Sequence, residues 1–538
     1  MEEKKEGGVW VPGAAVSGTV YLVGGGPGDP SLLTLRGAEL LASAEVILHD
    51  ELIHPALLEL ARGDAIVLPV GKRGSDLGSK QAKQDAIEAE LVHYGLAGKS
   101  VVRLKGGDPY LFGRGSEEAE ALVRAGIPFE VVPGIPSPLG ATAYAGFSVT
   151  HRDFASSVIF VSGTTRAGRL YDFSEIASVK GTVCVLMGMH HLDEVVAGLV
   201  GPGKRDLDVP VAAIQWGTWA KQRVVLGVLG DIVEKVREAG AGSPAIVLVG
   251  RVATLREELR WFDSRPLFGK RVLVLRPSSQ AGSSAKILRG RGAEAISWPA
   301  IEIGPPPDTA PLAKLARTLG EWDVVVFTSE NGVERFFGAI DEAGLDVRVF
   351  GRSIVAAIGS GTAAALAARG IKADIVPRDF RGEALANAIV THPFVATRLS
   401  EQKPVRVVIP RALVAREVLP ETLREKGCEV LVVPAYETKT ASESRKAELR
   451  QMLAQKEVDV VLLSSSSTAK ALSEALGEQT NALLSGVLVA SIGEVTTESA
   501  RALGLDVQVT ATTSTMPGLI QALEAYYGAS PSTRMGLE

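Results

Sequence analysis

The stretch that decides the fold is VGGGPGDP at residues 23–30, together with GGDPYLFGRG at residues 106–115. Each follows a β-branched apolar run, at 19–23 and 101–104, so each lies where a strand ends. Glycine at a strand end permits positive φ and lets a ligand approach the backbone closely. Because open α/β sheets bind ligands at the carboxyl ends of their strands, the two loops predict a shared small-molecule cleft.

The first loop differs from the dinucleotide-binding pattern G-x-G-x-x-G, although Asp50 follows at the distance expected of a ribose ligand. The chain also has no G-x-x-x-x-G-K-[ST] phosphate loop. We therefore discount a nicotinamide site. Taken alone, the loop at 23–30 fits a tight turn before a packed helix equally well.

The composition is that of a soluble globular protein of several domains, with 46% apolar and 22% charged residues in 538. The net charge of −5 argues against a general nucleic-acid partner. The charged start MEEKKEGG is no signal peptide, and no apolar run is long enough to span a membrane. Cys184 and Cys428 lie in apolar runs and fit core packing in a reducing compartment, so we expect a cytoplasmic protein.

Short β runs alternate with amphipathic helices from residue 18 onward, after a flexible tail at 1–17. The pattern predicts two lobes, at about 18–132 and 133–262, and then a linker at 263–270. Within the first lobe, Ser31 is expected to cap a helix that runs to Ser43.

Residues 271–528 contain an internal repeat at an offset near 135, followed by a tail at 529–538. RVLVLRP at 271–277 recurs as RVVIPR at 406–411, and DVVVFTS at 323–329 recurs as DVVLLSS at 459–465. A period this long predicts a duplicated α/β lobe with a cleft between the two copies. The strand-end loops carry small hydroxyl residues that suit anions at helix N-termini or, equally, simple N-caps. The candidate anion-binding residues are Thr328, Ser329, Ser464 and Ser465.

The motifs of the first half, in their order, resemble the tetrapyrrole methylase family, and within it the uroporphyrinogen-III C-methyltransferases. They are YLVGGGPGDP at 21–30, VGKR at 70–73, GGDPYLFGRGSEE at 106–118, PGI at 133–135, AYAG at 143–146 and THR at 150–152. Residues 270–528 resemble the bilobal uroporphyrinogen-III synthases. The fold class implied is α/β throughout, a two-lobed methylase domain followed by a bilobal, internally duplicated synthase domain.

The resemblance implies that S-adenosylmethionine binds between the two lobes of the first half. The contacts implied by the motifs are Pro27, Gly106, Gly107, Asp108, Leu111, Pro136, Ser137, Met187, Gly217 and Ala245. Related sequences usually have threonine where this chain has Pro136, so the hydroxyl at that position is missing here.

The resemblance also implies catalytic roles. Asp50 and Lys72 stand at the proton acceptor and proton donor positions, and Arg114, Glu117 and Arg152 match residues that handle substrate. A tetrapyrrole with eight carboxylates requires local cations in an acidic protein, because arginine forks bind carboxylates in bidentate fashion. The cations that we expect to be available are Arg103, Lys105, Arg114, Arg152, Lys221 and Arg223.

For the second half, the implied substrate is hydroxymethylbilane, with Tyr436 assisting the leaving hydroxyl. Candidate carboxylate binders are Arg276, Arg378, Arg381 and Arg411. We assign no metal, because His190 and His191 are adjacent and have no third ligand in evidence. The resemblance also implies a homodimer formed through the methylase half.

Three functions remain open from the sequence. The first is a bifunctional enzyme that converts hydroxymethylbilane to uroporphyrinogen III and then to precorrin-2. The second keeps the methyltransferase but makes the C-terminal half a non-catalytic tetrapyrrole-binding module. The third is a methylase for another substrate, such as a later corrin intermediate, an RNA or a protein.

Overall fold

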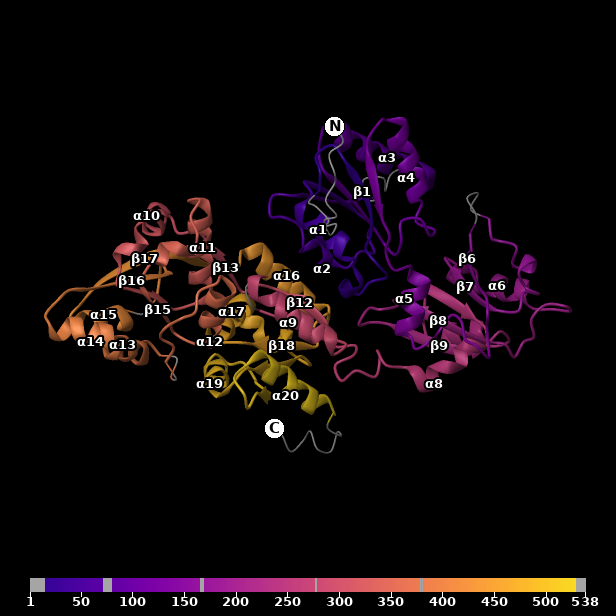
Figure 1. Cartoon of the computed structure of the whole chain (residues 1–538). Helices are drawn as coiled ribbons and strands as arrows, with labels where there is room; N and C mark the ends of the chain where they lie inside the picture. Colours follow the sequence, from indigo (N-terminus) through magenta and orange to yellow (C-terminus); the bar gives the residue numbers. More distant parts are fainter. Residues whose placement is uncertain are drawn as a thin grey trace. The chain divides into compact units, whose positions relative to one another are not determined.

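The computed structural model describes residues 15–70, 80–164, 169–275, 278–377, 379, 381–415 and 417–528. The chain forms two compact units. The first consists of Met1–Arg271 with Leu288–Glu294, and the second of Val272–Ile287 with Ala295–Glu538. In Figure 1 the first unit runs from indigo to magenta and most of the second from orange to yellow.

The first lobe of the first unit is a parallel sheet in the order β3-β2-β4-β1-β5. Its strands are β1 (Val20–Gly24), β2 (Val46–His49), β3 (Ile66–Pro69), β4 (Val101–Lys105) and β5 (Phe129–Val132). Its helices are α1 (Leu35–Ser43), α2 (Pro55–Leu58), α3 (Lys80–Leu96) and α4 (Gly115–Arg124). Helices cover both faces, because Tyr21 of β1 packs with α1 and α2 whereas its neighbour Leu22 packs with α3 and α4. Such double coverage explains why β1 and β4 are buried at every position.

The second lobe is a mixed sheet in the order β6-β7-β10-β8-β9, with only β6 and β7 parallel. Its strands are β6 (Val158–Ser162), β7 (Thr182–Leu186), β8 (Pro210–Gln215), β9 (Arg223–Val228) and β10 (Ala245–Val249). Its helices are α5 (Ser137–Tyr144), α6 (Leu192–Leu199), α7 (Ile232–Glu238) and α8 (Arg256–Leu259). The chain passes from the first sheet to the second where β5 leads into α5.

The expected helix start at Ser31 is wrong. Asp29 accepts a hydrogen bond from Ser31 N and caps a short 3-10 turn, Pro30–Leu32. The α1 helix begins only at Leu35, after Thr34 accepts from Gly37 N. Two successive caps compete here, and the proline at position 30 fits the first turn of the earlier one.

The second unit contains two five-stranded sheets. One has the order β12-β11-β18-β19-β20 and the other β13-β17-β16-β14-β15. The strands are β11 (Arg271–Val274), β12 (Glu294–Ser297), β13 (Ile301–Gly304), β14 (Val324–Phe327), β15 (Ile354–Ala357), β16 (Val405–Ala412), β17 (Cys428–Thr440), β18 (Val460–Leu463), β19 (Leu488–Ser491) and β20 (Val509–Thr510). The helices are α9 (Ser278–Gly290), α10 (Ala310–Thr318), α11 (Glu330–Glu342), α12 (Ser360–Ala368), α13 (Gly382–Thr391), α14 (Pro393–Ser400), α15 (Val418–Glu425), α16 (Glu443–Ala454), α17 (Ser466–Leu476), α18 (Thr480–Leu483), α19 (Glu494–Ala502) and α20 (Met516–Gly528).

The sequence repeat predicts one lobe per copy, but each sheet takes strands from both copies. In one sheet β11 of the first copy pairs with β18 of the second, and in the other β16 of the second copy pairs with β14 of the first. The repeat is still visible, because the orders β12-β11-β18-β19 and β17-β16-β14-β15 are equivalent under the offset. The chain passes between the sheets near Ala300 and Ala441, which are joined by a hydrogen bond from Ala441 N to Ala300 O at 3.3 Å.

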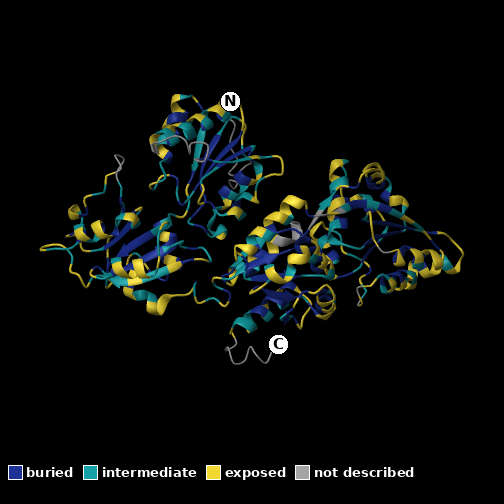
Figure 2. Ribbon diagram, turned by 180° about the vertical axis from the view of Figure 1, so that it is seen from behind, coloured by how far each residue is buried: buried dark blue, intermediate teal, exposed yellow. Residues whose placement is uncertain are grey.

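Burial follows the sheets. In Figure 2 most strands are dark blue, and the flanking helices show yellow outer faces. In the sheet β13-β17-β16-β14-β15, the alternating residues Val325 and Phe327 pack with α10 and α11, whereas Val324 and Val326 pack with α13, α14 and α15. Helices therefore cover both faces of this sheet.

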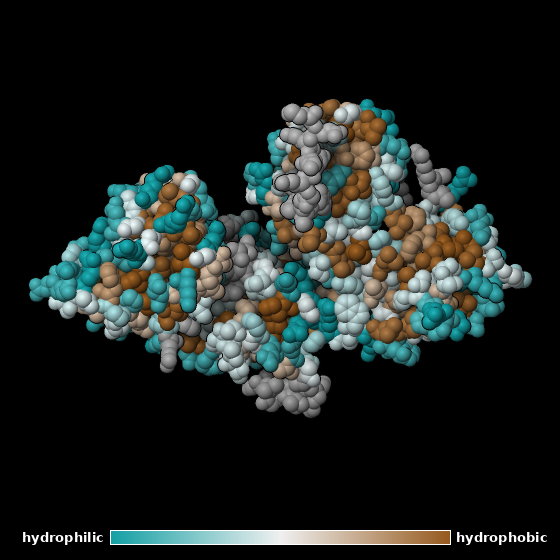
Figure 3. Space-filling view, in the orientation of Figure 1, coloured by the Kyte–Doolittle hydropathy of each residue, from teal (hydrophilic) through white to brown (hydrophobic). Residues whose placement is uncertain are grey.

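The surface mixes hydrophilic and apolar side chains (Figure 3). Leu35, Val414 and Val495 are among the most exposed large apolar residues, at 84%, 88% and 74%. Within the described ranges, no helix has the length and apolar character needed to cross a membrane.

Candidate active sites

Three glycines pack backbone against backbone where β1, β4 and β5 end. A Cβ on Gly24 would lie 2.5 Å from the Cα of Gly134, and a Cβ on Gly134 would lie 2.3 Å from the carbonyl oxygen of Gly107. Any side chain at Gly24 or Gly134 would therefore clash with neighbouring backbone. Gly106 differs, because a Cβ there would meet no atom within 4 Å. The backbone at Gly106 is therefore not packed against other parts of the chain, and that residue lines the main cavity of this unit.

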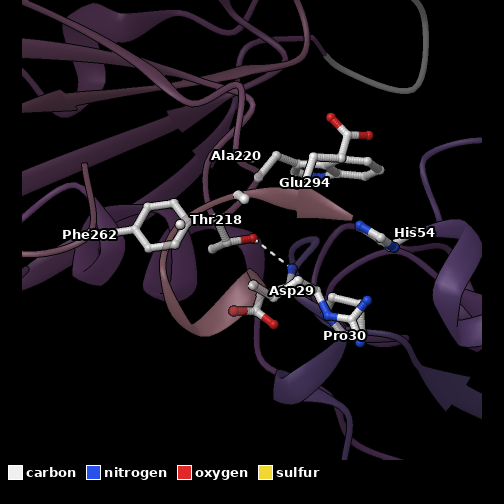
Figure 4. A pocket seen from close by; sticks show the side chains of 11 residues that line it. Asp29, Pro30, His54, Thr218, Ala220, Phe262 and Glu294 are labelled. Atoms are coloured by element: carbon white, nitrogen blue, oxygen red, sulfur yellow. Dashed lines mark hydrogen bonds between the residues drawn. The ribbon is translucent and has the colours of Figure 1, made fainter. Parts of the chain in front are cut away.

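Asp29 ties the first loop to the second lobe of the unit. Its backbone N–H donates to Thr218 Oγ1 at 2.9 Å, as Figure 4 shows, and its carboxylate accepts from Tyr144 Oη at 2.9 Å. The small pocket beside this contact, near His54, has a volume of about 20 Å³. That volume suits a water molecule and is too small for a cofactor.

Asp108 organises the second loop from within. Its Oδ1 accepts from the backbone N–H groups of Tyr110 (2.8 Å) and Leu111 (3.1 Å), and its Oδ2 accepts from Gly134 N (3.0 Å). One carboxylate thus joins the 106–113 loop to the end of β5. Its described contacts hold the loop's shape.

The main cavity of the first unit has a volume of about 620 Å³ and is lined by both lobes. That volume is in the range of small-molecule sites. The lining residues from the first lobe are Gly26, Pro27, Asp50, Glu51, Leu52, Val70, Lys83, Gln84, Ile87, Arg103, Lys105, Gly106, Gly107, Phe112, Gly113 and Arg114. Those from the second lobe are Ser137, Ala141, Leu186, Met187, Ile214, Trp216, Gly217, Trp219, Pro244, Ala245 and Ile246.

Strained backbone gathers around this cavity. Phe112, Arg114, Met187 and Trp216 all have positive φ, between 50° and 59°, and all four line it. A bulky residue in the left-handed region costs free energy and persists only where its surroundings impose it. The backbone strain marks the same cavity as the glycine loops.

Asp50 follows β2 and reaches the cavity with 34% of its side chain exposed. Its Oδ1 accepts from Arg103 Nη2, and its Oδ2 accepts from Gly106 N at 3.0 Å. Burial opposes ionisation, but the charges of Arg103 and Lys105 outweigh it and lower the pKa of the Asp50 carboxyl. The group is therefore an ionised carboxylate that touches the predicted cofactor loop.

Arg103 and Lys105 are not free to bind carboxylates, contrary to expectation. Their side chains are only 2% and 3% exposed, and both contact Glu118 of α4, which is fully buried. Lys105 Nζ donates to Glu118 Oε1 at 2.7 Å. Helices cover both faces of β4, so cations on this strand need a buried acid as partner.

Arg114 and Glu117 form a pair at the cavity mouth. Arg114 donates to the Glu117 carboxylate through Nε at 3.0 Å and Nη2 at 2.5 Å, and to Gln81 Oε1 at 3.2 Å. Both partners keep about a third of their side chains exposed.

Arg152 lies apart on an exposed turn and does not line the cavity. Lys72, the predicted proton donor, falls outside the described residues.

Of the ten predicted cofactor residues, seven line the cavity and three do not. The seven are Pro27, Gly106, Gly107, Ser137, Met187, Gly217 and Ala245. Asp108, Leu111 and Pro136 are not among the lining residues, and Pro136 stands at the N-cap of α5. Sequence reasoning missed Trp216 and Trp219, over which Lys221 Nζ lies at 3.5 and 5.0 Å from the ring centroids. Their only sequence signal is their position around Gly217.

The second unit has a cavity of about 640 Å³ beside the sheet β13-β17-β16-β14-β15. Its lining residues are Thr328, Ile358, Arg381, Gly382, Glu383, Arg411, Ala412, Ala415, Val418, Leu419 and Tyr436. Pairing of β16 with β17 brings Arg411 near Tyr436, with a register shift after Arg411. Arg411 is nearly buried and forms an ion pair with Glu417. Four of the predicted residues, Thr328, Arg381, Arg411 and Tyr436, therefore line one cavity.

The hydroxyl loops serve mainly as helix caps. Ser329 Oγ accepts from Gly332 N at 3.0 Å at the start of α11, and it shares a hydrogen bond of 2.9 Å with Tyr436 Oη. Ser465 caps α17 in a capping box with Thr468. Ser464 and Ser465 follow β18 in the other sheet and do not line the cavity of Tyr436.

Two further arginines that the sequence offered as carboxylate binders, Arg276 and Arg378, lie outside the described residues. Arg381 lies at the start of α13 with 78% of its side chain exposed. Across the described ranges, no three His, Cys, Asp or Glu side chains are grouped to hold a metal ion.

Comparison with known proteins gives matches over both halves. The family model of tetrapyrrole (corrin/porphyrin) methylases matches residues 19–233, and that of uroporphyrinogen-III synthase HemD matches residues 283–521. A porphyrin biosynthesis protein HemD of Ruminiclostridium josui is 35% identical over 508 residues, which is 94% of this chain and 97% of that protein. A uroporphyrinogen-III C-methyltransferase of Bacillus subtilis is 40% identical over 335 residues, 62% of this chain and 68% of that protein.

Among solved structures, a uroporphyrin-III C-methyl transferase from Thermus thermophilus, complexed with S-adenyl homocysteine, is 37% identical with a TM-score of 0.39. It covers 44% of this chain and 99% of that one.

Two α/β units, each with a small-molecule cavity beside its strands, define a fused two-domain enzyme. The chain belongs to the family of the porphyrin biosynthesis protein HemD and joins a tetrapyrrole methylase domain to a uroporphyrinogen-III synthase domain. It is a bifunctional enzyme of tetrapyrrole biosynthesis, and the resemblance drawn from its motifs is confirmed.

Proposed function

We propose that the first unit binds S-adenosylmethionine in its 620 Å³ cavity and methylates uroporphyrinogen III twice, giving precorrin-2. The observation that carries this proposal is the open backbone of Gly106 at the cavity wall, in a chain with a methyltransferase relative aligned over 335 residues. When bound, the cofactor supplies an electrophilic methyl group.

The residues present fit such a group. Gly106 leaves room for a ligand against the backbone, and Gly107 adopts a φ of +71°, which glycine permits without strain. Met187, Ile214 and Ala245 supply an apolar wall from the second lobe. An apolar wall with a few convergent polar groups is the usual form of a small-molecule site.

Asp50 accepts the proton that the macrocycle loses after methylation. Its carboxylate is ionised, reaches the cavity and is oriented by Arg103 and Gly106 N, so it is a general base in position before substrate arrives. Arg114 lies at the mouth with a third of its side chain exposed, where its guanidinium can exchange Glu117 for a substrate carboxylate. Lys72 as proton donor, Arg152 as substrate contact, a dimer through this unit and a cytoplasmic location remain predictions.

The second unit closes hydroxymethylbilane to uroporphyrinogen III in the cavity of Tyr436. The Tyr436 hydroxyl, held by Ser329, assists the leaving hydroxyl, and Arg411 and Arg381 supply positive charge for the carboxylates of the bilane. Positioning of a flexible linear substrate accounts for most of the rate in this scheme. The product of this unit is the substrate of the first.

Transfer of labelled methyl from S-adenosylmethionine to uroporphyrinogen III tests the proposal for the first unit. We expect two methyl groups per macrocycle from the full chain, and loss of transfer in Asp50→Asn with S-adenosylhomocysteine binding retained. Absence of labelled product in the unmodified chain would refute the proposed substrate, and full activity in Asp50→Asn would refute the proposed base.

A further inference from the structure

A fully buried acid lies behind the methyl-transfer site. Glu118 of α4 has no exposed side-chain surface, and its Oε1 accepts from Arg103 Nε at 3.2 Å and from Lys105 Nζ at 2.7 Å. Both cations project from β4 and are themselves almost completely buried. Buried charges persist only when they are paired, so this cluster forms as a set.

The same cluster reaches the cavity through one guanidinium. Arg103 donates to Glu118 through Nε and to Asp50 Oδ1 through Nη2, while Asp50 Oδ2 accepts from Gly106 N. The two carboxylates, Asp50 and Glu118, and the two cations, Arg103 and Lys105, make a formally neutral group. The Glu118 carboxylate therefore reaches Asp50 through Arg103, because its hydrogen-bond partners among the described residues are Arg103 and Lys105.

We propose that Glu118 and Lys105 are positioning residues for methyl transfer, which hold the Arg103 guanidinium against Asp50 and keep that carboxylate charged and directed at the Gly106 loop. This inference rests on the proposed function of Asp50 as proton acceptor. Neither residue needs to touch substrate. Each acts through charge and through the orientation of Arg103.

Removing the Lys105 cation and removing the Glu118 anion must shift the pKa of Asp50 in opposite directions. The charged groups that lower the pKa of Asp50 are Arg103 and Lys105 of β4, and both contact Glu118 of α4. Glu51, Lys83 and Arg114 line the same cavity, and the His49 ring contacts the Asp50 backbone oxygen. Loss of the Lys105 cation raises the pKa of Asp50, because a cation that favours the carboxylate is gone. Loss of the Glu118 anion lowers that pKa, because two cations then face the single carboxylate of Asp50.

The test is the pH dependence of uroporphyrinogen-III methylation by full-length variants at saturating S-adenosylmethionine. The variants are Lys105→Met, Glu118→Gln and the double variant, with Glu120→Gln as the matched control. Glu120 lies on the same helix with 71% of its side chain exposed, so its loss should leave the profile unchanged.

We expect the acid limb of kcat/KM to move to higher pH in Lys105→Met and to lower pH in Glu118→Gln, with kcat at least tenfold lower in each. The double variant should return towards the unmodified limb, because the group is neutral again. Affinity for S-adenosylhomocysteine should change by less than threefold. The inference would be overturned if the acid limbs of Lys105→Met and Glu118→Gln moved in the same direction, or if neither moved.

Glu118→Asp keeps the test valid if the glutamine variant does not fold, since it retains the charge on a shorter arm. It should keep the unmodified acid limb and lose rate, whereas a shifted limb would contradict the account. Failure of this inference is distinct from failure of the proposed function. An unmodified chain that does not methylate uroporphyrinogen III, or a fully active Asp50→Asn, would refute the proposed function itself.

Discussion

Alanine substitutions at Gly134 and Gly106 should separate stability from ligand binding in the first unit. A Cβ on Gly134 would lie 2.3 Å from Gly107 O and 2.7 Å from the Cα of Gly24, so rigid backbone on two sides must move. A Cβ on Gly106 would meet no protein atom within 4 Å, yet it would project at the cavity wall. The first change strains the fold, and the second occupies space in which we propose that the cofactor binds.

The magnitudes follow from these contacts. Overpacking of a close-packed interior costs about 1–3 kcal/mol. At about 2–4 °C per kcal/mol for a domain of this size class, Gly134→Ala should lower the Tm of the first unit by about 2–12 °C. Gly106→Ala should stay within about 0.5 kcal/mol in stability. Its Kd for S-adenosylhomocysteine should rise about tenfold or more, which corresponds to a loss of about 1.4 kcal/mol.

Differential scanning calorimetry without ligand and titration calorimetry with S-adenosylhomocysteine measure the two effects separately. Gly63→Ala is the control, because its Cβ also meets no atom within 4 Å and Gly63 lies away from the cavity lining. Unchanged affinity in Gly106→Ala would refute the placement of the cofactor against this backbone. Unchanged Tm in Gly134→Ala would refute the backbone packing.

Four further predictions concern individual side chains. Asp108→Ala removes a carboxylate that accepts three backbone N–H groups, at about 1.5–3 kcal/mol per charge-assisted bond, and should weaken S-adenosylhomocysteine binding at least tenfold in calorimetry. Folding lowers the pKa of Asp50 below its unfolded value of 3.8, so ionised Asp50 stabilises the first unit above about pH 4. This stabilisation is lost as the pH falls through the folded-state pKa, and Asp50→Asn should remove that part of the dependence of Tm on pH. Arg411→Ala should raise the KM for hydroxymethylbilane about tenfold, and an unchanged KM would exclude this cation from the substrate site. Tyr436→Phe should slow ring closure and release some uroporphyrinogen I without abolishing activity, and complete inactivation would show that chemistry dominates over positioning.

The strand positions were predictable because local sequence specifies them. β-branched runs that end in glycine loops mark β1 and β4, and the loops that follow both strands line the cavity. The pairing of strands in the second unit was not predictable in the same way. A repeat identifies equivalent strands, but it does not show which strands of the two copies pair with each other. The pairing of β11 with β18 and of β16 with β14 is therefore visible only in the fold.

The buried cations show a different limit. Arg103 and Lys105 look available to substrate, because charge in a sequence suggests exposure. Helices on both faces of β4 bury them, and their partner Glu118 comes from the following helix. Their position in a strand covered on both faces could have predicted this burial, because a buried cation needs an acidic partner nearby. The positive φ of Met187 and Trp216 has no such signal, because it arises from tertiary constraints.

The most direct test of the central claim is incubation of the full chain with hydroxymethylbilane, with and without S-adenosylmethionine, followed by identification of the products. We expect uroporphyrinogen III without the cofactor and precorrin-2 with it. Uroporphyrinogen I alone in both reactions would mean that the second unit does not catalyse ring closure. Uroporphyrinogen III that stays unmethylated when S-adenosylmethionine is present would contradict the proposed activity of the first unit.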